Sequence, residues 1–303
     1  MIEFKSISKT FRTEFWKPGF KALDELNFKL QAGSLTGFLG ANGAGKTTSL
    51  KILFQFIKAD QGEVLFDESL GSDWGEIRSN IGFVPERPYF YPHLTGREFL
   101  FFMGGLNNVS KAEIKSCIND WAERLGIEFA LDRKVRGYSK GMLQRIGLLS
   151  ALLNNPKLLI LDEPLSGLDP LGRTELKKSF LELNKLGMTI FFSSHIVSDV
   201  EEVCEDVIVI DKGKLVYEGS IREALESKQD TSIIIEIRPN NQSFEESILS
   251  KAISQTDDLL RLSIKSHEEK ENLLKEVIAG EAELLSVNKE KLTLEEFVYH
   301  VRG

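Results

Sequence analysis

The sequence has little cysteine, no long apolar run and no excess of basic residues. Its two cysteines, Cys117 and Cys204, lie far apart and outside any CxxC spacing, so no disulfide framework or zinc site is predicted and both thiols are expected to be reduced. No stretch reaches the ~20 consecutive apolar residues of a membrane-spanning helix, and the first residues lack the apolar run of a signal peptide. We therefore expect a cytoplasmic protein that is not embedded in a membrane by itself, although it could dock onto a protein that is.

The charge balance bears on the partners of the chain. The net charge is -8, from 38 Lys and Arg against 46 Asp and Glu. Non-specific nucleic-acid binding needs a basic footprint, so this balance argues against such a partner, and only a local basic strip would be compatible with it. The length of 303 residues suits one large domain, or one medium domain with an appendix.

Apolar patterns predict an α/β protein. Strands are expected at 2–11, 26–30, 34–39, 158–161 and 188–192, and a hairpin at 206–218. The region 93–155 is expected to be mostly helical, because Thr95 with Glu98 and Ser110 with Glu113 have capping-box spacing. After about residue 219, strand-like runs at 232–237 and 259–264 alternate with charged helices, which indicates a small C-terminal α/β domain.

One segment fits the GxxxxGK[ST] phosphate-loop pattern. It reads Gly40-Ala41-Asn42-Gly43-Ala44-Gly45-Lys46-Thr47, is followed by Thr48, and lies between an expected strand and an amphipathic helix at 47–57. Glycines let successive backbone N–H groups point at phosphate oxygens, and the helix N-terminus adds its positive dipole end. Lys46 is expected to reach the β- and γ-phosphates, and the Thr47 hydroxyl to ligate magnesium. By itself the loop indicates only a nucleoside triphosphate, and the alternative is a glycine-rich turn without function.

A second candidate site follows the apolar run at 158–161. Asp162 and Glu163 come directly after it, at the carboxyl end of a buried strand, where parallel α/β sheets bind ligands. Asp162 is placed to hold magnesium through water, and Glu163 to polarise the water that attacks the γ-phosphate. An acidic pair at a strand end is common on its own, so the phosphate loop gives this pair its predicted function.

A histidine ends the other buried strand. His195 follows Ser193 and Ser194 after the apolar run at 188–192. Taken singly, a histidine there is more often structural. Because its strand is expected to end beside Asp162 and Glu163, we expect His195 to contact the γ-phosphate rather than to bind a metal.

Together these motifs resemble those of the ATP-binding-cassette (ABC) ATPases, the nucleotide-binding subunits of membrane transporters. The resemblance covers residues 1–220, which it implies to be the cassette, and leaves 221–303 as an accessory domain. It implies a phosphate-loop NTPase core with a mainly parallel sheet, an N-terminal antiparallel β part and a helical subdomain at about 93–155. Phe11 resembles the aromatic that stacks on adenine, with Phe15 and Trp16 as competitors and a core role for Phe11 as an equal alternative.

The resemblance also implies a site that one subunit cannot complete. Tyr138-Ser139-Lys140-Gly141-Met142 stands at the place of the family's signature, and Ser166-Gly167-Leu168-Asp169 resembles its D-loop. In this family Ser139 and Gly141 would face the γ-phosphate held by a second subunit, so ATP would join two copies head to tail, and Asp169 is counted with the nucleotide-binding residues. Alternatively Ser139 only caps the helix that follows it, and both roles are compatible.

Two positions depart from the family's pattern. The usual signature is Leu-Ser-Gly-Gly-Gln, and Lys140 here adds a cation. Glu86 stands where most members carry glutamine, so it keeps an oxygen for magnesium or water, loses an amide donor and adds a negative charge. Both variants resemble the branch that drives exporters of drugs and polysaccharides, often with a separate membrane subunit.

We therefore expect an ATPase subunit that binds ATP and Mg²⁺, dimerises on ATP and powers a transmembrane permease, peripheral on the inner face of the membrane. The aromatic segment after Glu86, with Tyr89, Phe90 and Tyr91, is either a docking surface for that permease or part of the core. A soluble ABC-type ATPase acting on ribosomes or DNA is the alternative, but such relatives usually fuse two cassettes or carry long coiled coils. A phosphate-loop kinase or GTPase would not explain the signature, the D-loop or His195.

Overall fold

The computed structural model describes residues 1–12, 19–226, 233–239, 252–256, 259–264, 267–276, 282–289 and 293–302. The chain divides into two compact units, one formed by Met1–Ile221 with Val298–Gly303 and the other by Arg222–Phe297. The second division falls inside the last helix, α11 (Leu294–Val301). Within these described ranges, no helix combines the length and the apolar character needed to cross a membrane.

A six-stranded sheet forms the centre of the first unit, in the order β5-β6-β7-β3-β8-β9. Five of its strands are parallel, namely β5 (Ile81–Val84), β6 (Leu158–Leu161), β7 (Thr189–Ser194), β3 (Leu35–Leu39) and β8 (Asp206–Asp211). β9 (Lys214–Ser220) returns antiparallel to β8, as the hairpin prediction requires. Every residue of β3, β6 and β7 is buried, which confirms that the apolar runs are central strands.

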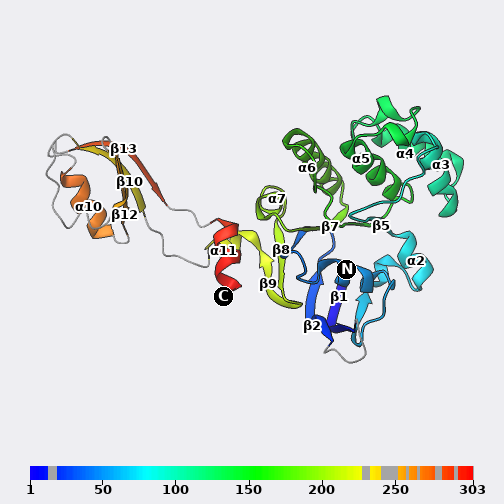
Figure 1. Cartoon of the computed structure of the whole chain (residues 1–303), viewed down its shortest axis with the longest axis horizontal. Helices are drawn as coiled ribbons and strands as arrows, with labels where there is room; N and C mark the ends of the chain where they lie inside the picture. The colour runs from blue at the N-terminus through cyan, green and yellow to red at the C-terminus, as the bar shows by residue number, and fades with distance from the viewer. Residues whose placement is uncertain are drawn as a thin grey trace. The chain divides into compact units, whose positions relative to one another are not determined.

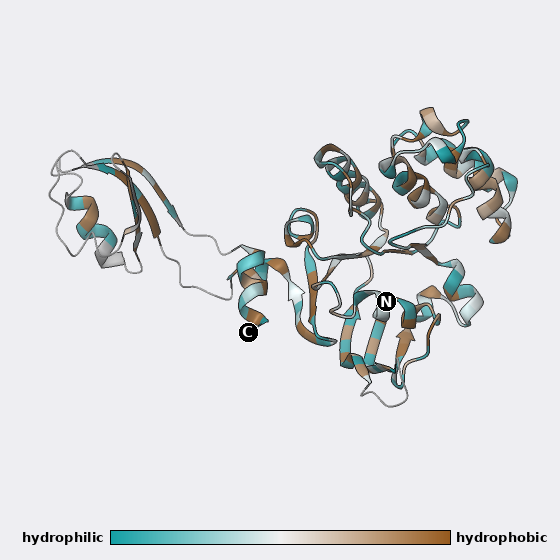
Figure 2. Ribbon diagram, in the orientation of Figure 1, coloured by the Kyte–Doolittle hydropathy of each residue, from teal (hydrophilic) through white to brown (hydrophobic). Residues whose placement is uncertain are grey.

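A second, antiparallel sheet of three strands contains the N-terminus. Its order is β2-β1-β4, with β1 (Ile2–Phe11), β2 (Phe20–Leu30) and β4 (Gln61–Phe66), and its strands carry alternating hydrophobic and hydrophilic bands in Figure 2. The expected strand 26–30 was too short, because the ladder with β1 continues as far as the pair Phe11 and Phe20. Phe28 stacks on Phe4 at 4.2 Å and lies 5.6 Å from Phe38, so aromatic rings join the two sheets.

Helices pack around the strands of the first unit. They are α1 (Lys46–Leu53), α2 (Trp74–Ser79), α3 (Gly96–Leu106), α4 (Lys111–Trp121), α5 (Lys140–Ala151), α6 (Pro170–Lys185) and α7 (Val197–Glu201), with short 3-10 turns at Glu68–Leu70, Glu128–Ala130 and Val135–Gly137. The division between the two units falls at the start of α8 (Ile221–Glu226). The capping boxes predicted at Thr95 and Ser110 are confirmed. The helix expected at 47–57 was too long, because Gln55 takes a φ of 56° that a right-handed helix cannot contain. Figure 1 shows α3, α4 and α5 as one group of helices beside the sheet.

The second unit is built on a four-stranded antiparallel sheet, against which a described helix packs. The strand order is β11-β12-β10-β13, with β10 (Ile233–Pro239), β11 (Ala252–Thr256), β12 (Leu259–Ile264) and β13 (Ala282–Lys289). Leu273 of α10 (His267–Glu276) joins Ile235, Ile237, Leu260 and Leu262 in a small core of its own. The runs at 232–237 and 259–264 are β10 and β12, whereas β11 and β13 were not predicted. The whole fold is α/β, with a mainly parallel central sheet and an antiparallel N-terminal sheet, as expected.

Candidate active site

Four neighbouring parallel strands bring the predicted site residues to one edge of the central sheet. β3 leads into the phosphate loop, β6 into Asp162 and β7 into His195, and Glu86 follows β5 after one residue. This edge borders a cavity of about 390 Å³. The predicted site residues that line the cavity are Ala41, Asn42, Gly43, Gly45, Lys46, Thr47, Thr48, Glu86, Glu163 and His195.

The phosphate loop depends on two glycines in left-handed conformations. Gly43 has a φ of 84° and Gly45 a φ of 113°, and a side chain on Gly45 would also lie 2.9 Å from the carbonyl oxygen of Ala22. The loop ends at α1, whose N-cap is Gly45 and whose first residue is Lys46. Lys46 is buried, donates to the carbonyl oxygen of Gly40 at 2.7 Å and lies 3.2 Å from Glu163 Oε1. Its ammonium group is therefore held between the loop and the acidic pair.

Asp162 is a buried carboxylate with two hydroxyl donors. Ser193 Oγ donates to Oδ1 at 2.6 Å, and Thr47 Oγ1 donates to Oδ2 at 3.2 Å. Burial raises the pKa of the Asp162 carboxyl above its ordinary value, because desolvation outweighs these hydrogen bonds, and the charges of Glu163 and Glu86 act in the same direction as burial. A cation at Asp162 would relieve this unfavourable charge.

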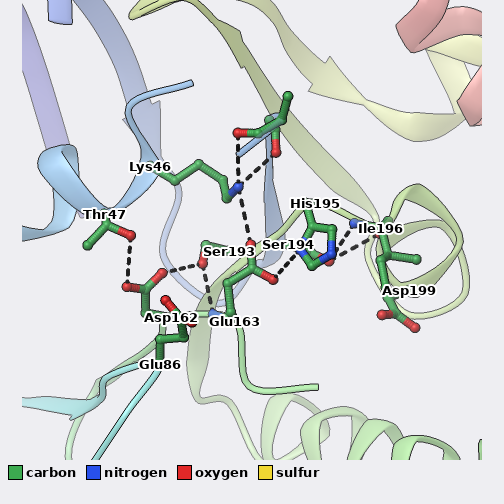
Figure 3. A network of polar contacts seen from close by, with 12 residues as sticks. Lys46, Thr47, Glu86, Asp162, Glu163, Ser193, Ser194, His195, Ile196 and Asp199 are labelled. Carbon is green, nitrogen blue, oxygen red and sulfur yellow. Dashed lines mark hydrogen bonds and ion pairs between the residues drawn. The ribbon is translucent and has the colours of Figure 1, made fainter. Parts of the chain in front are cut away.

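Glu163 lies between two nitrogen groups. Oε1 faces Lys46, and Oε2 is 2.8 Å from Nδ1 of His195, so one carboxylate joins residues from three strand ends (Figure 3). Its backbone has a φ of 49°, a strained conformation for a residue with a side chain, of the kind that is concentrated at functional sites. His195 is more than one-third exposed, and Glu163 is mostly buried. The structure thus brings Lys46, Glu163 and His195 together, as expected from their separate motifs.

Ser193 is a member of this network that sequence reasoning missed. Its hydroxyl donates to Asp162 and accepts a hydrogen bond from the backbone N–H of Glu163 at 2.9 Å (Figure 3). One buried hydroxyl therefore holds both the side chain of Asp162 and the strained backbone of Glu163. The sequence signal was slight: Ser193 is a polar residue at the end of an apolar run, and two residues before the predicted histidine.

Comparison with known proteins places this geometry in a family. The family model for "ABC transporter" matches residues 23–166. An uncharacterised ABC transporter ATP-binding protein of Synechocystis is 40% identical over 239 residues, which are 78% of this chain and 67% of that protein. The chain belongs to the ABC transporter ATP-binding proteins. It is an ATPase subunit that binds nucleotide, with the α/β cassette fold.

Two further relatives of this cassette are informative. The bacitracin transport ATP-binding protein BcrA of Bacillus licheniformis is 40% identical over 200 residues, covering 65% of this chain and 64% of BcrA. The solved structure of MJ0796, described as a dimeric bacterial ABC transporter cassette, is 25% identical with a TM-score of 0.64 and covers 73% of this chain and 99% of that one.

The cassette offers a donor set that fits a magnesium ion. Thr47, Asp162 and Glu86 present hydroxyl and carboxylate oxygens, the hard ligands that Mg²⁺ prefers, and Mg²⁺ commonly takes only one or two carboxylates together with phosphates and water. Asp162 is the member whose charge is least favourable without a cation. These three residues would hold the ion.

The signature and D-loop residues lie at helix starts. Ser139 caps α5 by accepting from the N–H of Met142 at 3.3 Å, so its capping role is confirmed, and Asp169 caps α6 by accepting from Gly172 at 3.2 Å. Neither Ser139, Gly141 nor Asp169 is among the residues that line the cavity, where the D-loop is represented by Ser166. Their contacts with nucleotide on a second subunit stay a prediction.

The adenine contact stays a prediction. Phe11 is exposed at the end of β1 and is not among the cavity-lining residues, whereas Phe20, its partner across the strand pair, is. Lys9 Nζ lies 5.7 Å from the centre of the Phe11 ring. The competing residues Phe15 and Trp16 fall outside the described part of the chain.

Proposed function

We propose that this cassette hydrolyses ATP with Glu163 as the base, Lys46 and His195 as phosphate ligands, and Mg²⁺ held by Thr47, Asp162 and Glu86. The single observation that carries the proposal is the position of Glu163 between Lys46 and His195. Lys46 would exchange Glu163 for phosphate oxygens, which frees Oε1 to accept the proton of the attacking water. His195 would remain on Oε2 and reach the γ-phosphate from its exposed side. The magnesium ion, when bound, neutralises charge on the phosphates.

Replacing Glu163 with Gln tests this role. The amide keeps the shape of the side chain but cannot take a proton, so we expect kcat to fall by about 10²–10⁴ while ATP binding is retained. Glu182→Gln is the matched control, because it removes an exposed carboxylate that pairs with Arg124 and does not line the cavity. Wild-type turnover by E163Q would refute the assignment of the base.

The active form is proposed to be a head-to-tail homodimer. Ser139 and Gly141 stand at the N-terminus of α5, where backbone N–H groups and the helix dipole favour an anion. The dimeric cassette MJ0796 supports this arrangement by similarity. E163Q should accumulate as a dimer on ATP in size-exclusion chromatography, and the second change Ser139→Arg should return it to monomer because a bulky cation would fill the interface. A monomeric E163Q that binds ATP would contradict the dimer.

The partner is proposed to be a transmembrane permease, and the direction of transport to be export. The resemblance to the exporter branch and the similarity to BcrA support this proposal. The chain would then act at the inner face of the membrane. We assign residues 1–220 to the cassette and 221–303 to an accessory domain. Affinity purification from detergent-solubilised membranes should recover a multi-span protein, and ribosomal subunits or DNA in its place would favour the alternative. Inverted membrane vesicles should take up cargo on addition of ATP if the direction is export.

The docking face is proposed to be the aromatic segment after Glu86. Tyr89 is 79% exposed and packs edge-on against Tyr91 at 5.4 Å, and Tyr91 packs against Phe102 of α3 at 4.9 Å. Phe90 packs toward Phe99, so Phe90 and Tyr91 anchor the segment to α3 and Tyr89 is the ring that it exposes. A helix of the permease would cover this face. Tyr89→Arg should abolish permease-stimulated ATPase activity and leave basal activity unchanged; stimulated activity equal to wild type would exclude this face.

A further inference from the structure

The segment that carries His195 is not fixed by its own helix. α7 has only five residues and begins two residues after His195. A helix so short is not stable alone, so its position depends on tertiary contacts. Locally, Ser194 Oγ accepts from the N–H of Ile196 at 3.0 Å, which shapes the turn between β7 and α7 but does not place α7 on the protein.

One contact that places α7 is apolar. Val200 is fully buried against β3, where Gly37 leaves room for it. A side chain on Gly37 would have its Cβ 2.2 Å from Val200 Cγ1, so the helix approaches the strand closer than any other residue would allow. This contact fixes the distance of α7 from the sheet.

The other contact is ionic, and it ties α7 to α6. Asp199 is buried, with Lys177 Nζ 2.8 Å from Oδ1 and Arg173 Nη1 3.5 Å from Oδ2. Lys177 is also buried and pairs with Glu202 at 2.7 Å, so α7 and the residue after it hold the same cation. A buried charge cannot give up its partners without a large cost, so these pairs fix α7 along its axis as well.

The cations stand on the helix that the D-loop begins. α6 starts directly after Asp169, and the N–H of Arg173 donates to the carbonyl oxygen of Asp169 at 3.0 Å. Arg173 and Lys177 are thus one and two turns from the D-loop. A continuous path of hydrogen bonds and ion pairs runs from Asp169 through α6 to Asp199 on α7. In Figure 3, Ile196 lies between the ring of His195 and Asp199.

We propose that Asp199 is a positioning residue for His195 in ATP hydrolysis, acting through its ion pairs with Lys177 and Arg173. The inference rests on the proposed role of His195. Without the carboxylate, α7 loses its own ion pairs to α6 and only the exposed Glu202 after it still holds Lys177. The turn at His195 is then less firmly held at the distance from which Nδ1 meets Glu163. Displacement of a reacting group by about 1 Å can reduce turnover strongly, so the effect falls on kcat. Nucleotide binding depends on the loop at 40–47 and is left unchanged.

The decisive variant is Asp199→Asn, which keeps the shape of the side chain and removes its charge. We expect kcat to fall about tenfold with the KM for ATP unchanged within about twofold. The double variant H195A/D199N should be no slower than H195A, because Asp199 acts only through His195. Glu182→Gln, which removes an exposed carboxylate of α6 that pairs with Arg124, should keep wild-type kcat. A kcat of D199N equal to wild type, or a further tenfold loss in the double variant, would overturn the inference.

A second variant separates positioning from folding. In Lys177→Met/Asp199→Leu the buried pair is replaced by apolar side chains, an exchange that commonly leaves stability unchanged or raises it. We expect a thermal midpoint no lower than that of wild type together with a kcat as low as that of D199N. Wild-type kcat in this folded variant would mean that packing alone positions α7. The proposed function fails in a different way, since it requires H195A itself to lose turnover whatever D199N does.

Discussion

Ser193→Ala tests how the two acidic residues are held in place. The hydroxyl is buried, donates to Asp162 Oδ1 at 2.6 Å and accepts from the N–H of Glu163 at 2.9 Å. Alanine removes both hydrogen bonds and leaves only the small space that the hydroxyl oxygen filled. No other residue of the described network contacts Asp162 and the backbone of Glu163 at once.

The expected loss of stability follows from these two hydrogen bonds. A hydrogen bond to a charged group contributes about 1.5–3 kcal/mol, and leaving a buried N–H without a partner costs about 1–3 kcal/mol. Part of this is recovered, because Glu163 can then relax from its φ of 49°, a strain of about 1–3 kcal/mol. We expect the free energy of unfolding to fall by about 2–3 kcal/mol, measured by urea denaturation.

The same relaxation should affect catalysis more than stability. Once the backbone of Glu163 moves, its carboxylate leaves the position between Lys46 and His195, and kcat should fall by about 10² while the KM for ATP changes little. Asp162 loses a donor, so more Mg²⁺ should be needed for half-maximal activity. Both quantities are measured by phosphate release over a magnesium titration.

Ser179→Ala is the matched control. Ser179 is also buried, but its hydroxyl only bonds back to the carbonyl oxygen of Glu175 within α6, so the change should leave stability and kcat unchanged. Wild-type kcat and magnesium dependence in S193A would refute the bridging role. A loss of kcat no greater than the fraction of protein unfolded under the assay conditions would refute it too, since Ser193 would then be structural.

Three further outcomes follow from the described structure. Asp162→Asn should raise the free energy of unfolding at pH 7.5, because the pKa of Asp162 is raised in the folded protein and the ionised carboxylate therefore destabilises the fold. This gain in the free energy of unfolding should vanish near and below pH 3.8, the ordinary pKa of the carboxyl. A loss of stability at pH 7.5 would contradict the prediction. Cys117, whose pKa burial raises to about 11, and the buried Cys204 should alkylate slowly with iodoacetamide at pH 7.5, with a thiolate fraction of only about 3 × 10⁻⁴ for Cys117, and mass spectrometry showing rapid labelling would disagree. Gly37→Ala should lower the free energy of unfolding by about 1–3 kcal/mol, and Val200→Ala in the same chain should restore part of it. A double variant no more stable than Gly37→Ala alone in urea denaturation would contradict this.

The sequence was sufficient for features that are local. Capping boxes depend on residues three apart, which is why Thr95 and Ser110 could be assigned as helix caps. The hairpin at Lys212 and Gly213 has positive φ values of 46° and 81°, as its turn chemistry requires. The phosphate loop likewise depends on glycines within one short segment. Each of these is fixed by neighbours in the chain.

Features that depend on strand register could not be read from the chain. β6 pairs with β7 so that Leu161 lies opposite Phe192, and this register places Ser193 beside Asp162, 31 residues away. A slip of one residue would put a different side chain there. The ion pairs of Asp199 depend in the same way on how α7 meets α6, and its position in a five-residue helix gives no periodicity to detect.

The unfavourable features of the site explain why it is built on strand ends rather than on loops. Asp162 is ionised at a cost from burial, and Glu163 has a strained backbone. Either would relax if its surroundings were mobile, so each must be held by groups that cannot move. The central strands supply such groups: Val84 O accepts from the N–H of Asp162 at 2.8 Å, and Ser193, on a wholly buried strand, holds the next residue. A cation at Asp162 and phosphates at Lys46 would remove the electrostatic part of the cost, so ligand binding should stabilise this edge more than any other part of the cassette. In the E163Q variant, hydrogen exchange of the backbone amides of residues 162 and 163 should slow on addition of ATP and Mg²⁺. Unchanged exchange rates at these two amides would mean that the protein alone already offsets the cost of the buried charge.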